Sequence, residues 1–280
     1  MAADRLLIVN ADDLGLAPGV TRGILDLAHQ GAITSTSALV TLPWSAEAVR
    51  SASVAGIDVG VHLTLSVGAP LSSPTTIPSL LAPGGRFPSA GVVVRRLALR
   101  RLALSEVERE WAAQIEAALD AGARPTHLDT HCHLHGFPSL ARVLAELARR
   151  YGAPSIRPAR AGFIAQPPRL SGLRYVHPLP HTRRAHGTPL PRPDYFTVLT
   201  VLGRLTTQRP LDALVRALPP GVTELVCHPG YVDAELRALD PLTTPREREA
   251  LILGRPAFKA LLEREGMRLV RRAEAWPEGA

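Results

Sequence analysis

Aromatic residues, cysteines and lysines are all scarce in this chain of 280 residues. Aromatic residues make up only 4% of it, so the core must be built mainly from Leu, Val, Ala and Ile. The two cysteines, Cys132 and Cys227, are too few for the disulfide framework of a small secreted protein, and we expect both to be free thiols. Hydrophobic residues nevertheless make up 46% of the chain, which excludes a disordered protein and allows a substantial core.

Long apolar segments are absent as well. No stretch approaches the roughly 20 apolar residues that a membrane-spanning helix needs. The first residues, MAADRLLIVNADD, have too short an apolar run and too early an acidic residue for a signal peptide. We therefore expect a cytoplasmic protein in a reducing compartment, with no membrane span.

Positive charge exceeds negative charge in the chain, but it is not concentrated in one place. The formal net charge is +7, which by itself would suggest a nucleic-acid partner. Almost all of the cationic residues are arginines, with Lys259 as the only lysine, and they are scattered along the chain. The densest basic stretch, RRLALRRL at residues 95–102, is typical of an amphipathic helix with one solvated face. We therefore expect no nucleic-acid partner.

The predicted elements alternate between strand and helix. Short apolar runs that end in turn residues predict strands at residues 5–11, 33–40, 56–65 and 222–230, with another near 154–159. Helical periodicity predicts helices at residues 18–31, 44–52, 105–122, 138–152 and 243–266. Ser105 and Glu108 fit a capping box at the start of the third of these helices. Repeated strand–helix units indicate an α/β fold with a parallel sheet or a barrel, and we expect one domain over residues 1–280.

Two stretches rich in proline interrupt this alternation, at residues 66–92 and 160–194. We expect both to be irregular insertions that form the walls of a ligand cleft. Three arginines lie in or just before the second stretch, namely Arg157, Arg183 and Arg184. We expect them to be solvated surface residues, with contact to an anionic group of a substrate as the alternative.

Polar residues follow the predicted strands at four points of the chain. In folds of this kind the ligand site lies at the carboxyl ends of the strands. The Asp12–Asp13 pair follows the first strand, His62 lies near the end of the third, His131 follows a short later strand, and His228 follows the last. Singly, each has an ordinary structural explanation, such as a turn, a helix cap or a hydrogen-bonded core histidine. Together they favour a common site at one rim.

The segment THLDTHCHLH at residues 126–135 holds four of the ten histidines of the chain. An extended strand would place its ionisable residues on one face, namely His127, Asp129, His131, His133 and His135. Cys132 would then point to the opposite face, away from His131. A helix would instead stack three of the histidines at i, i+4 spacing, but Pro125 and the short length favour a strand followed by a loop.

Five motifs of the chain resemble, in order, those of the YdjC-like carbohydrate deacetylases: LLIVNADDLGL, ITSTSALV, GVHLTL, PTHLDTHCHLHGFP and CHPG. The resemblance runs from residue 5 to about residue 235. It implies a distorted, TIM-like (β/α) barrel related to the polysaccharide deacetylases, a divalent metal ion, and removal of acetyl groups from N-acetylated sugars or oligosaccharides. A homodimer is left open. Leu14 and Cys132 depart from the pattern of the family, which usually has Phe and His at these positions.

The resemblance also implies a role for each matching residue. Asp13, His62 and His131 would bind one divalent metal ion, and Asp12 would be the catalytic base. Two imidazoles and a carboxylate suit Mg or Zn, with Co or Ni as further candidates. His228 is our candidate for the acid that protonates the departing amine, because of its predicted place near the rim.

Two further expectations concern the surroundings of these residues. Neighbouring side chains on a strand point apart, so Asp12 and Asp13 can serve one site only where the chain bends, and Gly15 would permit the bend. Asp129 and His133 are candidates to orient a ligand imidazole through its other ring nitrogen.

Two other classes of protein compete with the deacetylase. Another metal-dependent barrel hydrolase, such as a phosphoesterase or a cyclic amidohydrolase, could use an HxH motif. Those barrels generally carry the motif on the first strand, whereas here NADD occupies that strand and HxH follows residue 125. A non-catalytic sugar-binding protein would be expected to offer stacking aromatic side chains, which are scarce here.

Overall fold

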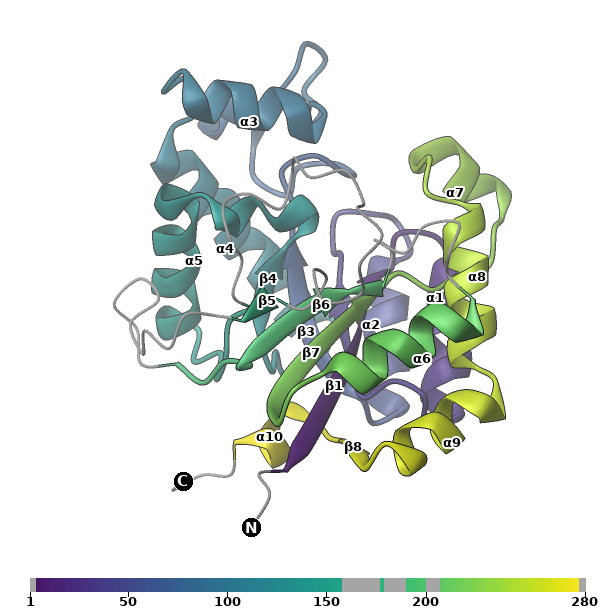
Figure 1. Ribbon diagram of the computed structural model, residues 1–280. Helices are drawn as coiled ribbons and strands as arrows, with labels where there is room; N and C mark the ends of the chain where they lie inside the picture. The colour runs from purple at the N-terminus through teal and green to yellow at the C-terminus, as the bar shows by residue number, and fades with distance from the viewer. Residues whose placement is uncertain (1–3, 158–176, 179–189, 200–206, 277–280) are drawn as a thin grey trace.

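The computed structural model describes residues 4–157, 177–178, 190–199 and 207–276 (Figure 1). Among these residues, eight strands form one sheet in the order β4-β3-β2-β1-β7-β6-β5, and β8 pairs with β1. The strands are β1 (Arg5–Leu14), β2 (Ser35–Ala38), β3 (Asp58–Leu63), β4 (Leu128–Thr130), β5 (His177–Pro178), β6 (Tyr195–Val198), β7 (Gly221–Cys227) and β8 (Met267–Leu269). Neighbouring strands are parallel except β5 and β6. The sheet curls like half of a barrel, so the predicted α/β fold of barrel type is confirmed.

Helices surround this sheet. They are α1 (Pro18–His29), α2 (Ser45–Val54), α3 (Ala90–Ala98), α4 (Leu104–Asp120), α5 (Pro138–Arg150), α6 (Gln208–Ala217), α7 (Ala234–Leu239), α8 (Thr244–Leu253), α9 (Pro256–Arg264) and α10 (Arg272–Ala275). In Figure 1, α4 and α5 lie on one side of the sheet, and α1 and α8 lie on the other. The helices therefore cover the edges and outer face that parallel strands need to bury.

Alternation within the strands divides their side chains between an outer and an inner face. In β1, Leu7, Val9 and Ala11 are fully buried and belong to the large hydrophobic cluster that also holds helix residues such as Ile24 and Trp111. The residues between them on the strand point to the opposite face, because successive side chains alternate. The outer face is thus apolar and holds the helices, which leaves the inner face for polar side chains.

The predicted helix at residues 105–122 is α4, which starts one residue earlier than expected. Its N-cap is Ala103, and no side chain forms a cap hydrogen bond there, so the predicted Ser105–Glu108 capping box is wrong. The end of the helix is as predicted, because Gly122 adopts a left-handed backbone with φ of 91° just beyond it.

Two other predicted elements differ from the structure. The helix predicted at residues 243–266 is two helices, α8 and α9, because Gly254 caps the first and Pro256 begins the second. The strand predicted near residues 154–159 is reduced to one isolated parallel bridge between Leu128 and Ile156.

The two predicted insertions differ in how much of them the structure describes. Residues 66–92 contain two short 3-10 helices, η1 (Pro74–Thr76) and η2 (Pro78–Leu80), and the start of α3. Most of residues 160–194 lies outside the described residues, so the proposed cleft walls and the single-domain organisation stay predictions. Within the described part of the chain, no helix is both long enough and apolar enough to cross a bilayer.

Candidate active site

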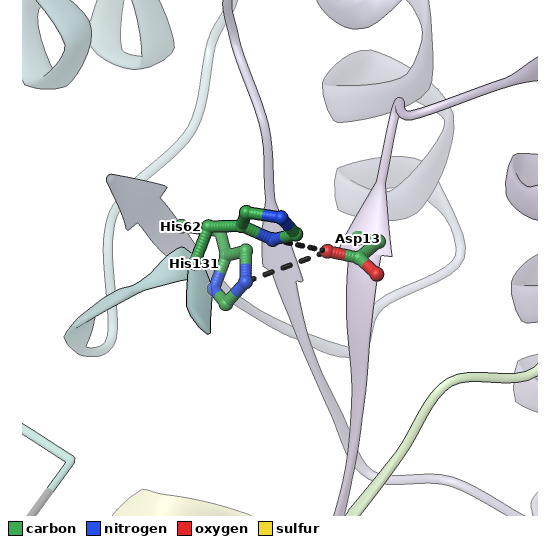
Figure 2. Close-up of side chains that lie close together, drawn as sticks. All are labelled: Asp13, His62 and His131. Atoms are coloured by element: carbon green, nitrogen blue, oxygen red, sulfur yellow. Dashed lines mark hydrogen bonds and ion pairs between the residues drawn. The ribbon is translucent and has the colours of Figure 1, made fainter. Parts of the chain in front are cut away.

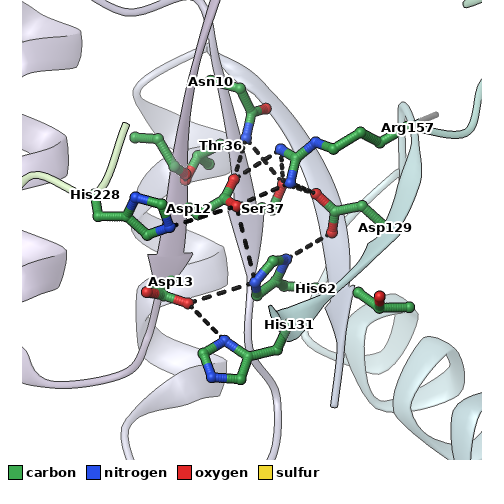
Figure 3. Close-up of polar contacts among 12 residues, drawn as sticks. Asn10, Asp12, Asp13, Thr36, Ser37, His62, Asp129, His131, Arg157 and His228 are labelled. Carbon is green, nitrogen blue, oxygen red and sulfur yellow. Dashed lines mark hydrogen bonds and ion pairs between the residues drawn. The ribbon is translucent and has the colours of Figure 1, made fainter. Parts of the chain in front are cut away.

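Four strands bring the predicted polar residues to one end of the sheet. Asp12 and Asp13 lie near the end of β1, and His62 lies near the end of β3. His131 directly follows β4, and His228 directly follows β7. Because these strands are parallel, their carboxyl ends meet at the same rim, as the sequence predicts (Figure 3).

The end of β1 contains an irregularity that separates Asp12 from Asp13. Its pairing with β2 runs from Ala11 opposite Thr36 to Leu14 opposite Ala38, so β1 carries one extra residue there, as in a β-bulge. Asp13 itself adopts a left-handed backbone with φ of 71°, which Asp tolerates better than most residues. The predicted bend is therefore present, but it begins at Asp13 rather than at Gly15.

Asp13, His62 and His131 form a compact group of three possible metal ligands (Figure 2). Oδ1 of Asp13 lies 3.4 Å from Nε2 of His62 and 3.2 Å from Nδ1 of His131. One ligand atom from each residue lies within 4.8 Å of the others. The side chains of Asp13 and His62 are buried, whereas that of His131 is 18% exposed. The group therefore meets solvent on the side of His131.

Neighbouring charges of both signs control the protonation of this group. Burial alone would raise the pKa of Asp13, but Arg246 and His131 hold it well below its ordinary value. Burial alone would lower the pKa values of both histidines. Asp129 and Asp12 instead raise the pKa of His62, and Asp13 raises that of His131 well above its ordinary value. The carboxylates that raise the pKa values of the two histidines also favour a cation between the three side chains.

Asp129 orients His62, as the sequence predicts. Its Oδ1 accepts a hydrogen bond of 2.7 Å from Nδ1 of His62, which directs Nε2 toward Asp13. The other carboxylate oxygen of Asp129 lies 2.6 Å from Nη1 of Arg157 and accepts a hydrogen bond of 2.8 Å from Ser37. Arg157 and His62 outweigh the effect of burial, so the pKa of Asp129 is well below its ordinary value.

Asp12 lies beside the group of three ligands and faces the inner side of the sheet (Figure 3). Two guanidinium nitrogens of Arg157 donate to its carboxylate at 2.7 and 2.8 Å, and Nδ2 of Asn10 donates at 2.7 Å. Its Oδ2 lies 3.9 Å from Nε2 of His62 and also 3.9 Å from Nε2 of His228. Burial would raise the pKa of Asp12, but Arg157 and His62 lower it, so the carboxylate is ionised at neutral pH.

Arg157 is the largest departure from the sequence predictions. It is fully buried rather than solvated, and it binds Asp12, Asp129 and Glu224. Glu224 also accepts a hydrogen bond of 2.7 Å from Arg272. The signal that could have revealed this network is Glu224 itself, because a carboxylate inside the apolar strand β7 requires a buried cation. Arg183 and Arg184 lie outside the described residues.

The histidine-rich segment keeps to one strand face for only part of its length. The strand β4 ends at Thr130, and the short helix η3 (His131–Gly136) follows. Within η3, Cys132 and His133 adopt left-handed backbone angles, with φ of 56° and 50°. The expected strand is therefore present, but the arrangement of ionisable residues on one face stops after Thr130, because the backbone turns immediately after the strand.

The other three histidines of the segment contact neighbouring side chains of the fold. His127 is fully buried, with Nε2 3.0 Å from Oγ of Ser37. Nδ1 of His135 lies 2.7 Å from Oγ1 of Thr130, within hydrogen-bond distance. The ring of His133 packs edge-on against Phe196, and burial and Arg157 lower its pKa to about 3. His133 is therefore neutral at neutral pH, and its role in orienting a ligand stays a prediction.

Helix α8 contacts the site at two points that the sequence does not predict. Nη2 of Arg246 donates to Oδ2 of Asp13 at 2.6 Å. Oε2 of Glu249, one turn later, accepts a hydrogen bond of 2.6 Å from the backbone N–H of His228. The imidazole of His228 is 18% exposed, and burial lowers its pKa despite the nearby Asp13 and Asp12. Its ring therefore lies at the rim in the neutral form.

The two cysteines are free, as predicted. Cys227 is buried, its thiol donates to the carbonyl of Asn10, and burial raises its pKa well above the ordinary value. Cys132 is exposed, but its thiol is close enough to His131 to raise the pKa of that histidine through a hydrogen bond. The prediction that Cys132 points away from His131 is therefore wrong, since the left-handed turn at Cys132 ends the strand alternation.

The fold and site together define an α/β protein with a carboxylate- and histidine-lined site at the carboxyl ends of a curled parallel sheet. The family described as YdjC-like protein matches residues 6–264, and the chain belongs to this family. The resemblance found in the five motifs is thereby confirmed.

Relatives named as deacetylases match almost the whole chain. A carbohydrate deacetylase of Geobacillus stearothermophilus is 32% identical, with 95% of this chain and 96% of that protein covered. A carbohydrate deacetylase of Halalkalibacterium halodurans is 35% identical over 89% of this chain and 95% of its own. A solved structure from Enterococcus faecalis V583, provisionally named for cellobiose-phosphate cleavage, has a TM-score of 0.80 at 30% identity. It covers 96% of this chain and 98% of its own, so the two proteins share one fold.

Proposed function

We propose that the protein is a metal-dependent hydrolase that removes acetyl groups from N-acetylated sugars. The observation that carries this proposal is the group of Asp13, His62 and His131 beside the ionised Asp12 at the open end of the sheet. The names of the two bacterial carbohydrate deacetylases support the same reaction and substrate class. So does a relative of 30% identity from Yersinia pestis, which is named a chitooligosaccharide deacetylase.

The three proposed ligands fit a catalytic divalent ion. Two imidazole nitrogens and one carboxylate oxygen leave further coordination positions for water and substrate. The bond from Nδ1 of His62 to Asp129 leaves Nε2 available as a ligand atom. Since the pKa values of His62 and His131 are raised, metal binding would release protons from these imidazoles. Mg or Zn suits this donor set, with Co or Ni as further candidates.

The reaction then follows from the positions of the remaining groups. A divalent ion at this site supplies polarisation of the acetamide carbonyl and of water. Asp12, kept ionised by Arg157, accepts the proton of the water that attacks the carbonyl carbon. His228 faces Asp12 across 3.9 Å and passes a proton to the sugar nitrogen as the C–N bond breaks. Because His228 is neutral at rest, it must first receive a proton, and Asp12 is the nearby group that has just taken one.

The proposal also covers the compartment, the substrate and the partners of the protein. Two free cysteines suit a reducing, cytoplasmic compartment. The scattered arginines give no reason to add a nucleic acid as a partner. An N-acetylated sugar or oligosaccharide remains the expected substrate, and a homodimer stays open.

Acetate release and metal content test the proposal together. Metal-stripped protein is supplied with Mg, Zn, Co or Ni ions and assayed for acetate release from a panel of N-acetylated sugars and chitooligosaccharides. We expect about one bound ion per chain, because the two possible donor groups, Asp13–His62–His131 and Asp12–His62–Asp129, share His62. His131→Ala should lose both the ion and the activity. The matched control is His29→Ala, which removes an exposed histidine at the end of α1.

Two results would contradict the proposal. If His131→Ala releases acetate at the wild-type rate, the group of Asp13, His62 and His131 does not take part in the reaction. Because the structural neighbour is provisionally named for cellobiose-phosphate cleavage, the panel also contains a phosphorylated disaccharide. Cleavage of that compound, with no acetate released from any N-acetylated sugar, would replace the deacetylase with another hydrolase.

A further inference from the structure

Arg246, on α8, is fixed at three points next to the proposed metal group. It is buried, and its Nε donates to the carbonyl of Leu242 at 3.0 Å. Its Nη2 lies 2.6 Å from Oδ2 of Asp13 and 2.6 Å from Oδ2 of Asp240. A planar guanidinium held by three acceptors cannot rotate freely, so it presents a fixed donor to Asp13.

The two oxygens of Asp13 therefore face different partners. Oδ1 lies near His62 and His131, at 3.4 and 3.2 Å. Oδ2 is bound to Arg246 on the opposite side of the carboxylate. A carboxylate can bind a metal ion through one oxygen or through both, and here the second oxygen is already engaged.

Building on the metal site of the proposed function, we propose that Arg246 is a positioning residue that makes Asp13 a one-oxygen metal ligand. By holding Oδ2, Arg246 directs Oδ1 alone toward the two imidazoles. A bound ion would then keep the coordination position that a chelating carboxylate would fill, and water or the acetamide oxygen could occupy it. Arg246 is not among the possible metal ligands, and it would act through its contact with Asp13.

Charge alone does not explain the position of Arg246. The guanidinium would repel a divalent cation, which would weaken metal binding if its charge were the main effect. However, Asp240 binds the same nitrogen as Asp13, so the Arg246–Asp240 pair is formally neutral. Because the charges of Arg246 and Asp240 offset each other, the main remaining effect of Arg246 is to orient the carboxylate of Asp13.

Variants can separate orientation from charge. Arg246→Met removes the donor and the charge, whereas Arg246→Met with Asp240→Asn removes the donor but preserves the net charge. The asparagine can still accept the hydrogen bond that Leu242 N–H now gives to Oδ1 of Asp240. The control is Arg248→Met, which removes a half-buried guanidinium from the same helix.

Calorimetric titration of metal-stripped protein with Zn²⁺ gives the first readout. We expect both Arg246 variants to bind Zn²⁺ about 10–100-fold more weakly than wild type, the usual effect of removing a group that orients a ligand. Arg248→Met should bind like wild type. Tighter binding by the single variant together with wild-type affinity of the double variant would overturn the proposal, because charge would then account for everything. Wild-type affinity in both would also overturn it.

The visible absorption of bound Co²⁺ gives a second readout, because it depends on the number and geometry of the ligands. We expect the spectrum of the double variant to differ from that of wild type, since the second oxygen of Asp13 becomes free to bind. Identical spectra would overturn the one-oxygen assignment.

Should circular dichroism show that the methionine variants do not fold, Arg246→Lys replaces them. It keeps the positive charge but lacks the rigid fork of the guanidinium. We expect weaker Zn²⁺ binding than in wild type, and wild-type affinity would overturn the proposal. A wild-type protein that binds no divalent ion would overturn the proposed function and this inference together, whereas normal binding by wild type and all variants would overturn the inference alone.

Discussion

The inner half and the outer half of the site differ in how completely they are enclosed. The inner half consists of Asp12, Asp129, Arg157 and Glu224, whose side chains are at most 1% exposed. In the outer half, the imidazoles of His131 and His228 are each 18% exposed. Among the described residues of the site, those of the outer half can therefore exchange ligands with solvent, whereas those of the inner half hold charges in fixed places. His62 joins the halves, since one ring nitrogen faces Asp129 and the other faces Asp13.

The inner half depends on very few cations. Arg157 binds three carboxylates at 2.6 to 2.9 Å, and Arg272 shares only one of them, Glu224. Buried ion pairs add little stability when they are complete, but removal of one partner leaves charges uncompensated. The inner half should therefore respond to mutation by losing stability, and the outer half by losing metal or turnover.

The largest effect is expected from Arg157→Met. This variant leaves Asp12, Asp129 and Glu224 buried without their main cation, so we expect unfolding to become easier by about 3–5 kcal/mol. Chemical denaturation followed by circular dichroism measures the loss. Arg142→Met, at an exposed position of α5, is the control and should change stability by less than about 0.5 kcal/mol. Equal stability of the two variants would show that the inner half is not held by charge.

The next prediction separates two neighbouring residues, one from each half. Asp12→Asn should keep the metal but lower turnover by about 10²–10⁴-fold, because the amide cannot accept the proton of the attacking water. Substrate affinity should change little, since that proton transfer stabilises mainly the transition state. Asp13→Asn should weaken metal affinity, because a neutral amide is a poorer ligand than a carboxylate.

Metal titration and acetate-release kinetics on both aspartate variants measure these effects together. If Asp12→Asn loses the metal while Asp13→Asn keeps it, the two roles are reversed. If both hydrolyse at the wild-type rate, neither half of the site takes part in the reaction.

A smaller effect is expected from the residue that links the halves. Asp129→Asn keeps the shape of the side chain but weakens the bond to Nδ1 of His62, so the imidazole loses its fixed orientation. We expect metal affinity to fall by about 10–100-fold. Asp120→Asn, at the exposed end of α4, is the matched control for removing one carboxylate. Unchanged metal affinity in Asp129→Asn would mean that the two halves act independently.

The residues at the strand ends could be predicted from the sequence to a greater extent than the arginines that bind them. Asp13, His62, His131 and His228 each follow or end a strand, so local periodicity and the parallel arrangement place them at one rim. The YdjC-like resemblance then assigns each of them a role, although the metal and catalytic roles themselves stay predictions.

The ion pairs of the two buried arginines could not be predicted, although Asp12 and Asp129 were, because the partners are far apart in sequence. Arg157 and Asp12 are separated by 145 positions, and Arg246 and Asp13 by 233. Nothing in the local pattern around Arg157 distinguishes a buried guanidinium from a solvated one, so the sequence favoured the commoner solvated state. The left-handed backbone at Asp13 and Cys132 was also beyond a pattern argument, since neither residue is a glycine.

The smallest effect is expected from the two thiols. Cys227 contacts the backbone of Asn10 and belongs to the buried side of the sheet, and a serine hydroxyl could donate the same hydrogen bond. Cys132 lies in the outer half beside His131, but its exposed thiol is not one of the ligand atoms proposed here. Cys132→Ser with Cys227→Ser should therefore keep the metal content and the turnover, with a stability loss of about 1 kcal/mol from the buried position. Each single variant is assayed beside the double one. A loss of about 10³-fold in turnover confined to Cys132→Ser, in a protein that still folds, would show that this thiol takes part in catalysis at the outer half.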